Sequence, residues 1–311
     1  MRLIKLIVLT LFMSIPVASF ADILPAPRQI APHSYAWIGP YGPPTKENQG
    51  FRMNLGFVVG DDAVAVIDSG YGDDMANAIL AQIRQITDRP VRYVINTNSQ
   101  PHRILGNAVL KKHGATIIAS ETASPRMVNE GATMASTAEN ILGLAPGSVH
   151  KPGSPDRGVQ KMTEISLGGI SLKVTPVGTA HTAGSLIVEV VEDRVIYAGD
   201  VLYTGRLLAV LPVSRVDGWI AAFDTLRSYK DTLFVPGHGE PGKLSDFEHS
   251  TYQYLTTLKT HMDGAIDQGL GLQESIDSLN QTPWKDLADF DALAGRNAHQ
   301  TYLERESAAF E

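Results

Sequence analysis

The sequence of 311 residues contains no cysteine. Disulfide bonds and thiolate metal ligands are therefore excluded, so any bound metal ion must be held by histidine, carboxylate or amide groups. Runs of lysine and arginine interleaved with aromatic residues are also missing, and the formal net charge is −7. This charge pattern argues against nucleic-acid binding and favours a small molecule or another protein as the partner.

Long apolar runs are scarce, and the longest, Leu6–Val17, lies near the amino terminus. Arg2 and Lys5 precede this run, and the small residues of Ser19-Phe20-Ala21 follow it. The run is too short for a stable transmembrane helix and is typical of a secretory signal peptide, residues 1–21. We therefore expect a mature protein that starts near Asp22, has no transmembrane segment and is periplasmic or secreted. The alternative is a buried amino-terminal helix.

Five short segments carry histidine, aspartate or amide side chains at the ends of predicted strands, and four of them also contain glycine. The central segment is Asn96-Thr97-Asn98-Ser99-Gln100-Pro101-His102-Arg103, which follows the β-branched strand Val91–Ile95. The other four segments are Ala65–Gly70, Gly178–Ser185, Val195–Asp200 and Val235–Gly239. Loops at one edge of a rigid sheet can direct such side chains to one point, so we expect the segments to meet.

These five segments resemble, in order and content, the motifs of the metallo-β-lactamase fold superfamily. That family carries N-T-H-x-H-x-D-H where this chain has residues 96–103. Relative to that pattern, histidines are replaced by Asn98, Gln100 and Arg103, and an aspartate is replaced by His102. Segments 215–220 and 296–310 also resemble the periplasmic SoxH-like or quinoprotein relay system metallohydrolases. The resemblance therefore implies this fold with a degenerate metal-binding motif.

The predicted elements alternate between strands and helices, which indicates an α/β protein. Asp73–Thr87 is expected to be an amphipathic helix, because Met75, Ile79, Ile83 and Ile86 recur at helical spacing. A strand meander is predicted between Glu164 and Tyr197. The resemblance implies a four-layer αββα sandwich for residues 22–243, and residues 244–311 are predicted to form a carboxy-terminal helical extension.

The resemblance also implies two metal sites, of which this chain keeps only parts. The three-histidine site would consist of Asn98, Gln100 and His181, and amides are weak zinc ligands. In the second site Arg103 cannot bind a metal ion; we expect it to pair with Asp200 instead. A single zinc ion, or none, is therefore expected. The residues left to hold one ion are His102, His181, Asp200 and His238.

Two main hypotheses for function follow, and the sequence leaves both open. The first is a pseudoenzyme that binds a small-molecule ligand or a periplasmic protein partner without metal-dependent hydrolysis. The second is a mononuclear hydrolase of an ester, thioester or lactam, in which Asp200 and His102 are the candidate catalytic residues. An accessory role in a periplasmic quinoprotein redox system is a third alternative. The remaining candidate pocket residues are Asn98, Gln100, Arg103, Asp68 and Tyr203.

Overall fold

The computed structural model describes residues 23–309, so the predicted signal peptide lies outside the described residues. Two mixed β-sheets form the centre of the molecule: a seven-stranded sheet in the order β1 to β7 and a five-stranded sheet in the order β12-β11-β10-β9-β8. The strands are β1 Arg28–Gln29, β2 Ser34–Trp37, β3 Leu55–Val59, β4 Val64–Ile67, β5 Val91–Ile95, β6 Thr116–Ser120, β7 Arg157–Val159, β8 Thr163–Ser166, β9 Ser171–Gly178, β10 Ser185–Val190, β11 Val195–Tyr203 and β12 Leu233–His238.

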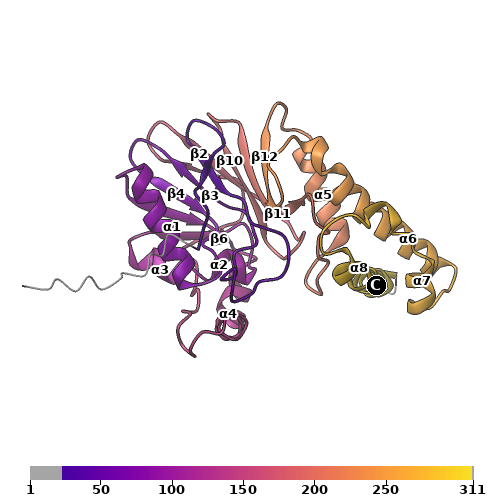
Figure 1. Cartoon of the computed structure of the whole chain (residues 1–311). Helices are drawn as coiled ribbons and strands as arrows, with labels where there is room; N and C mark the ends of the chain where they lie inside the picture. Colours follow the sequence, from indigo (N-terminus) through magenta and orange to yellow (C-terminus); the bar gives the residue numbers. More distant parts are fainter. Residues whose placement is uncertain (1–22, 310–311) are drawn as a thin grey trace, which may run out of the picture.

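Helices cover the outer face of each sheet (Figure 1). The α-helices are α1 Asp73–Ile86, α2 Pro101–Ile104, α3 Asn107–Lys112, α4 Ser124–Leu142, α5 Val216–Leu226, α6 Tyr254–Asp267, α7 Leu272–Ser278 and α8 Phe290–Ala309. Shorter helical turns lie at Leu244–Phe247, Glu248–Gln253 and Thr282–Trp284. No helix within residues 23–309 is long and apolar enough to cross a membrane.

Three hydrophobic clusters lie between successive layers and confirm the predicted four-layer arrangement. In β3, Leu55 and Phe57 pack toward α1, whereas Val58 packs between the two sheets. Both faces of the central strands are therefore buried, which explains their nearly continuous apolar sequences. A third cluster lies on the outer face of the second sheet, where Trp219 and Phe223 of α5 pack. The order of layers is helix, sheet, sheet, helix.

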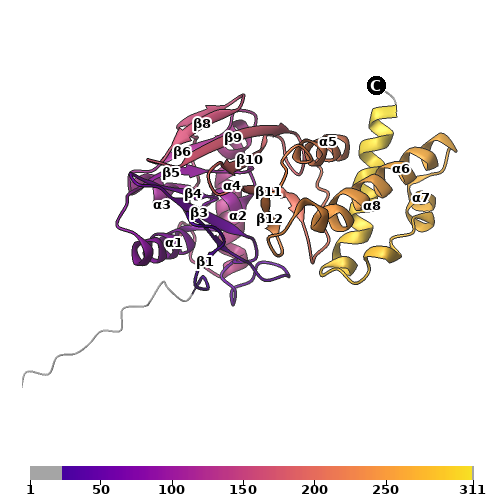
Figure 2. The ribbon, with the colours of Figure 1, turned by 90° about the horizontal axis from the view of Figure 1, so that it is seen from above.

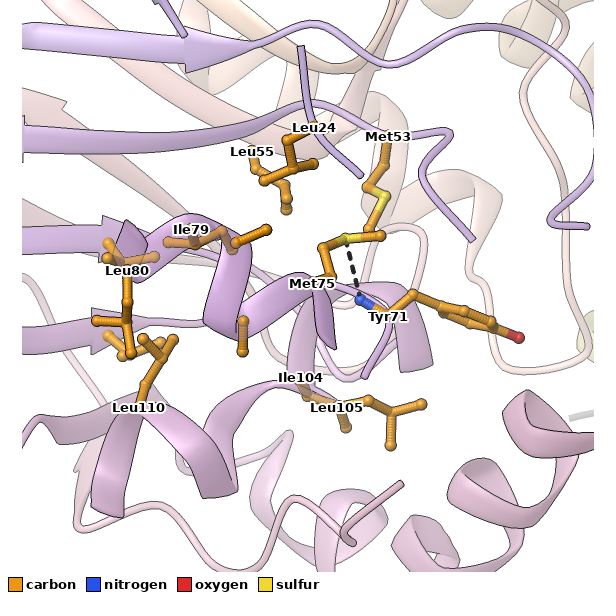
Figure 3. Packing of buried hydrophobic residues seen from close by; sticks show 14 of the residues in the cluster. Leu24, Met53, Leu55, Tyr71, Met75, Ile79, Leu80, Ile104, Leu105 and Leu110 are labelled. Carbon is orange, nitrogen blue, oxygen red and sulfur yellow. Dashed lines mark hydrogen bonds between the residues drawn. The ribbon is translucent and has the colours of Figure 1, made fainter. Parts of the chain in front are cut away.

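The first outer cluster is built as the sequence predicts around α1. Met75, Ile79 and Ile83 are buried, and Figure 3 shows Met75 and Ile79 facing Leu55 of β3. The expectation for Ile86 was wrong, because the helix ends at this residue and its side chain is exposed. The segment Gly70–Gly72 lies before α1, and the backbone N–H of Tyr71 donates to the sulfur of Met75 (Figure 3). The motif that precedes α1 is thereby attached to the core.

The carboxy-terminal helices α6, α7 and α8 lie beyond α5, at the end of the molecule opposite α1 (Figures 1 and 2). They are not isolated from the sandwich, since Leu258 of α6 and Ala298 of α8 belong to the same hydrophobic cluster as Trp219. Asn297 of α8 also accepts a hydrogen bond from the backbone N–H of Val210. The predicted helical extension is therefore present, and it packs on the second sheet's helical layer.

Some element boundaries differ from the sequence-based expectations. The sequence predicts a helix over residues 105–113 and a loop over residues 145–158. The helix is present as the shorter α3, a separate short helix, α2, precedes it, and the predicted loop ends inside strand β7. Strand β11 continues to Tyr203, although the sequence predicts that the strand ends at the Gly-Asp of Asp200. The parallel ladder with β12 shifts register on both sides of Gly199, whose φ is 51°. Pairing with β12 thus extends β11 beyond the end that the local sequence pattern predicts.

Candidate functional site

The loop after β5 is held in place by Asn96 of the central motif and by Asn107, the first residue of α3. The side-chain amide of Asn96 donates to the backbone carbonyl of Arg103 at 2.9 Å and to Asn107 Oδ1 at 3.1 Å. Asn107 Nδ2 returns a hydrogen bond to Asn96 Oδ1 at 2.8 Å. All three residues are buried, so these contacts fix the start of α2 relative to the end of β5. The side chains between them are therefore presented from a rigid turn.

Arg103 lies at the centre of the site and is fully buried. Its Nε and Nη2 donate to the two carboxylate oxygens of Asp200 at 3.1 and 2.7 Å. Nη1 donates to Asp68 Oδ2 at 3.1 Å and to the carbonyl of Asn54 at 2.6 Å, and Nη2 also donates to the carbonyl of Gly237 at 3.0 Å. All five N–H groups of the guanidinium are thereby used. The ion pair predicted between Arg103 and Asp200 is present, with the bidentate geometry that makes such pairs strong.

The carboxylate of Asp200, like the guanidinium of Arg103, is saturated with hydrogen bonds. Besides the two bonds from Arg103, Oδ1 accepts from the Tyr203 hydroxyl at 3.2 Å and Oδ2 accepts from Asn98 Nδ2 at 2.7 Å. Four donors thus occupy the roughly four lone-pair positions of an ionised carboxylate. Burial alone would raise the pKa of Asp200, but the charge of Arg103, followed by contacts with His102 and His181, holds it well below its usual range. The residue is a buried, ionised acceptor.

Glycines let two backbone segments approach this ion pair closely. A Cβ at position 199 would lie 2.3 Å from Thr97 Oγ1, and one at position 237 would lie 2.3 Å from Asp200 Oδ1 and 2.7 Å from Arg103 Nη2. Only glycine fits such close approaches. The Gly-Asp and Pro-Gly-His motifs are therefore required by packing around the arginine, whatever chemistry the site performs.

Asp68 is the second carboxylate bound to Arg103. Its oxygens accept from the Thr97 backbone N–H at 2.7 Å and from the Thr97 hydroxyl at 2.8 Å, as well as from Arg103. Burial raises the pKa of Asp68 to about 6, although Arg103 and Thr97 favour its charged form. With φ of 64° it adopts a left-handed conformation that aspartate tolerates. Asp68 thus links the end of β4 to the central motif.

Three histidines surround this cluster: His181 and His238 are buried, and His102 is half-buried. His102 Nε2 lies 3.4 Å from Asp200 Oδ2, and His238 Nε2 lies 3.4 Å from Asp200 Oδ1. His181 packs edge-on against Trp219 with ring centroids 5.2 Å apart. Burial lowers the pKa of His102 and of His181 to about 4, and it also lowers the pKa of His238 well below its ordinary value. All three imidazoles are therefore neutral near pH 7, which is the form that binds metal ions.

The candidate three-histidine site does not fit a metal ion. Asn98 Nδ2 donates to Asp200, and Asn98 Oδ1 accepts from the backbone N–H of Gln100 at 2.8 Å. Both polar atoms of Asn98 are thus engaged in holding the loop. Gln100 presents a buried Nε2 without a hydrogen-bond partner, which is a donor and not a ligand atom. Of the residues predicted for this site, only His181 offers an imidazole.

A second group of ligand atoms comes closer to a metal site. His102, Asp200 and His238 offer atoms that all lie within 4.8 Å of one another. His238 Nδ1 donates to the carbonyl of Arg52 at 2.8 Å, which leaves its Nε2 lone pair facing Asp200. The 3.4 Å nitrogen–oxygen separations match the edge of a tetrahedron around zinc, about 3.3 Å for bonds of about 2.0 Å. One ion fits this spacing, provided that Asp200 gives up one of its present donors.

Several residues of the site were missed by sequence reasoning. Asn54 donates from Nδ2 to the carbonyls of Pro236 and Gly239, and so it holds the Pro-Gly-His-Gly turn. Arg52 and Asp289 also lie beside His238, together with Arg206. Arg52 and Asn54 precede the predicted hairpin strand, and Asp289 lies in the carboxy-terminal extension. None stands in a motif of its own, so only the tertiary structure brings them to the site.

Comparisons with known proteins agree with this geometry. Residues 50–238, more than half of the chain, match the model of the family described as "Metallo-beta-lactamase superfamily". A linear primary-alkylsulfatase from Pseudomonas sp. (strain ATCC 19151) is 22% identical over 259 residues, covering 71% of this chain and 49% of that protein. The acyl-coenzyme A thioesterase MBLAC2 of Gallus gallus is 32% identical over 91 residues, covering 28% of this chain and 32% of that protein. The chain thus spans half or less of the length of these curated relatives.

A solved structure shows the same fold. A metallo-beta-lactamase from Pontibacter korlensis superposes with a TM-score of 0.58 at 19% identity, covering 74% of this chain and 98% of that one. The share of this chain that is left uncovered is comparable in size to the carboxy-terminal helices. At this level of identity the likeness concerns the fold alone.

Proposed function

The chain belongs to the metallo-β-lactamase superfamily, and from that premise we propose that it is a ligand-binding protein that does not perform two-metal hydrolysis. One observation carries the proposal: Arg103 and its partners saturate the carboxylate of Asp200. Two zinc ions bring a charge of +4 that needs anionic ligands, whereas Arg103 already supplies a permanent positive charge between Asp68 and Asp200. A guanidinium thus serves as the counter-charge to both carboxylates.

Ligand binding is supported by buried polar atoms that have no partner among the described residues. These are Gln100 Nε2, His102 Nε2 and His181 Nδ1. Leaving a buried polar group without a hydrogen bond costs about 1–3 kcal/mol, so three such groups in one site favour a bound polar molecule that supplies partners. The degenerate motif is then a binding pocket, which supports the pseudoenzyme hypothesis.

A mononuclear hydrolase is the second candidate, favoured by the spacing of His102, Asp200 and His238. A bound zinc ion would be held by these residues and would supply a polarised water molecule. The relatives named as an alkylsulfatase and an acyl-coenzyme A thioesterase make sulfate esters and thioesters, beside esters and lactams, the compounds to assay. In this case Asn98 or Tyr203 must release Asp200 when the ion binds.

Metal content separates the two candidates. The full chain is purified, exposed to zinc, passed over a desalting column and analysed for metal, beside an Asp200→Asn variant. We expect no tightly held zinc and no hydrolysis above that of the variant. If the wild type instead holds one zinc ion and hydrolyses a substrate, and the Asp200→Asn variant does neither, the protein is a mononuclear hydrolase. About two tightly held ions per chain would contradict both.

We also propose that the mature protein is periplasmic or secreted and belongs to the SoxH-like or quinoprotein relay system branch. The basic start, the apolar run and the small residues before Asp22 support the first proposal. Segments 215–220 and 296–310 support the second. In the structure both segments meet at one place, because Glu304 of α8 accepts a hydrogen bond from the backbone N–H of Val216 at 2.9 Å. Fractionation of the native cells and sequencing of the mature amino terminus test the localisation.

A further inference from the structure

A buried arginine, Arg206, and a half-buried one, Arg52, share a single carboxylate beside His238. Arg206 Nη2 lies 2.8 Å from Asp289 Oδ2, and Arg52 Nη2 lies 3.8 Å from the same oxygen. The side chains of Arg206 and Arg52 are only 6% and 18% exposed. Asp289 reaches them from the loop before α8, where residues 206 and 288 form an isolated parallel bridge. The carboxy-terminal extension therefore supplies the only carboxylate within 4 Å of either arginine in the described part of the chain.

Arg206 is far less satisfied than Arg103, although both are buried. Its Nε has no hydrogen-bond partner. Its Nη1 lies 3.4 Å from His238 Nδ1, but that nitrogen already donates its hydrogen to the carbonyl of Arg52, so it has no lone pair to accept with. The contact with Asp289 lacks hydrogen-bond geometry, since Oδ2 is itself unpartnered. Arg206 thus makes an ion-pair contact with Asp289 and lies over the Tyr203 ring, while its buried Nε donor is unused.

Arg52 shows the same deficit. Its Nε is buried without a partner, and its guanidinium lies too far from Asp289 for a hydrogen bond. Burial, followed by the charge of Arg206, lowers the pKa of Arg52 to about 10. Of the other charges that act on it, Asp200 is committed to Arg103, and Tyr203 is a neutral phenol whose ring lies 5.9 Å from Arg206 Cζ. Two cations thus face one another with one carboxylate between them.

We propose that Arg52 and Arg206 bind the oxyanion group of a small-molecule ligand, a carboxylate, sulfate or phosphate. Such a group presents two or more acceptor oxygens that match the planar donor fork of arginine, and it would use the donors that protein groups leave free. Asp289 would then hold the arginines in the absence of the ligand and compete with it for them. The proposal deepens the ligand-binding function proposed above, because the site borders His238 and so the Asp200 cluster.

The test measures binding of inorganic sulfate, inorganic phosphate and acetate to the full chain by calorimetry, at ionic strength matched with sodium chloride. It is performed on protein as purified and after dialysis against a chelator. We expect saturable binding of at least one of these anions at one site, with the same affinity in both preparations. Binding that disappears after chelation would assign the anion to a metal ion and overturn the proposal, as would the lack of saturable binding for all three.

Substitutions of the two arginines test whether the anion binds at this site. Arg206→Met and Arg52→Met should each weaken the affinity for the anion by about tenfold or more, because each substitution removes a bidentate charge-assisted contact. Arg227→Met is the matched control, since Arg227 pairs with Asp224 and Glu248 on the exposed surface, and it should leave the affinity unchanged. Equal binding in wild type and Arg206→Met, or a loss in the control, would refute the assignment.

Asp289→Asn distinguishes an anion site from a purely structural cluster. Removal of the competing carboxylate should tighten anion binding, whereas a structural role predicts unchanged or weaker binding, which would overturn the proposal. This variant also decides the question if an arginine variant fails to fold. The measurements on chelated protein do not depend on metal stoichiometry or hydrolysis. The anion site and the proposed absence of two-metal chemistry can therefore fail separately.

Discussion

Replacing Arg103 with methionine tests whether the guanidinium has become the structural counter-charge of the site. The side chains have similar length, so the change removes the charge and five donors with little loss of volume. Two buried carboxylates, Asp68 and Asp200, and two buried carbonyls then lose a partner. Removal of one partner from a buried ion pair costs roughly 3–5 kcal/mol, a large part of the stability of a typical domain.

The penalty should depend on pH with a defined sign. In the wild type the pKa of Asp200 lies below its unfolded value, so its contribution to stability is present near neutrality and is lost as the pH falls. Without Arg103, burial raises the pKa of Asp200 above the unfolded value of about 3.9. The variant then loses stability as the pH rises from about 4 through that raised pKa. The difference from wild type is therefore larger at about pH 8 than at about pH 5.

Urea denaturation of the chelated protein at both pH values measures this difference. The control is Arg227→Met, whose partners are exposed and whose cost should not exceed about 1 kcal/mol. Arg103→Lys should fall between wild type and Arg103→Met, because an ammonium cannot replace the planar fork. Asp200→Asn in the Arg103→Met background should recover part of the loss. A cost below about 1 kcal/mol for Arg103→Met, or an equal cost at both pH values, would refute the reasoning.

Three further predictions concern the metal site, pH and the amino terminus. Restoring histidine, histidine, aspartate and histidine at positions 98, 100, 102 and 103 should raise the number of tightly bound zinc ions toward two, measured by metal analysis. No gain in a variant that keeps its circular dichroism spectrum would show that the surrounding residues have also changed. In the chelated wild type, His102 and His181 have pKa values near 4, below the unfolded value of about 6.5. Their contribution to stability is therefore full above about pH 6.5 and is lost as the pH falls, by up to about 1.4 kcal/mol per pH unit for each histidine. A urea midpoint that does not decrease when the pH is lowered from about 6.5 to about 5 would contradict this prediction. Mass spectrometry of the native protein should find a terminus near Asp22, and an intact Met1 would reject the predicted cleavage.

The local sequence was sufficient for most elements of the sandwich. The spacing of Met75, Ile79 and Ile83 predicted the buried face of α1, and the β-branched run Val91–Ile95 predicted β5 with its observed bounds. These predictions hold because period and residue type depend on neighbours within a few positions. The boundaries of β11 and β12 were missed, since their last residues pair with each other across the sheet and not with their own neighbours.

The resemblance to the family also predicted, from the sequence, that several residues of the central motif depart from the family pattern. It predicted that Arg103 would pair with Asp200, because both stand at positions that point to one place in the fold. Only the tertiary structure decided that Asn98 and Tyr203 complete the saturation of Asp200 and that His102 comes within 3.4 Å of it. Hydrogen-bond saturation depends on side-chain direction and backbone approach, which no single motif contains.

The grouping of Arg52, Arg206 and Asp289 belongs wholly to the tertiary structure. The three residues come from the segment before β3, the segment after β11 and the loop before α8. In the sequence Arg206 is a pocket candidate only through its position near Asp200, and Arg52 and Asp289 have the appearance of ordinary surface charges. Packing of the carboxy-terminal helices on the second sheet buries them together. Burial is what turns these charges into a site, because the free energy of an unpaired charge depends on its access to water.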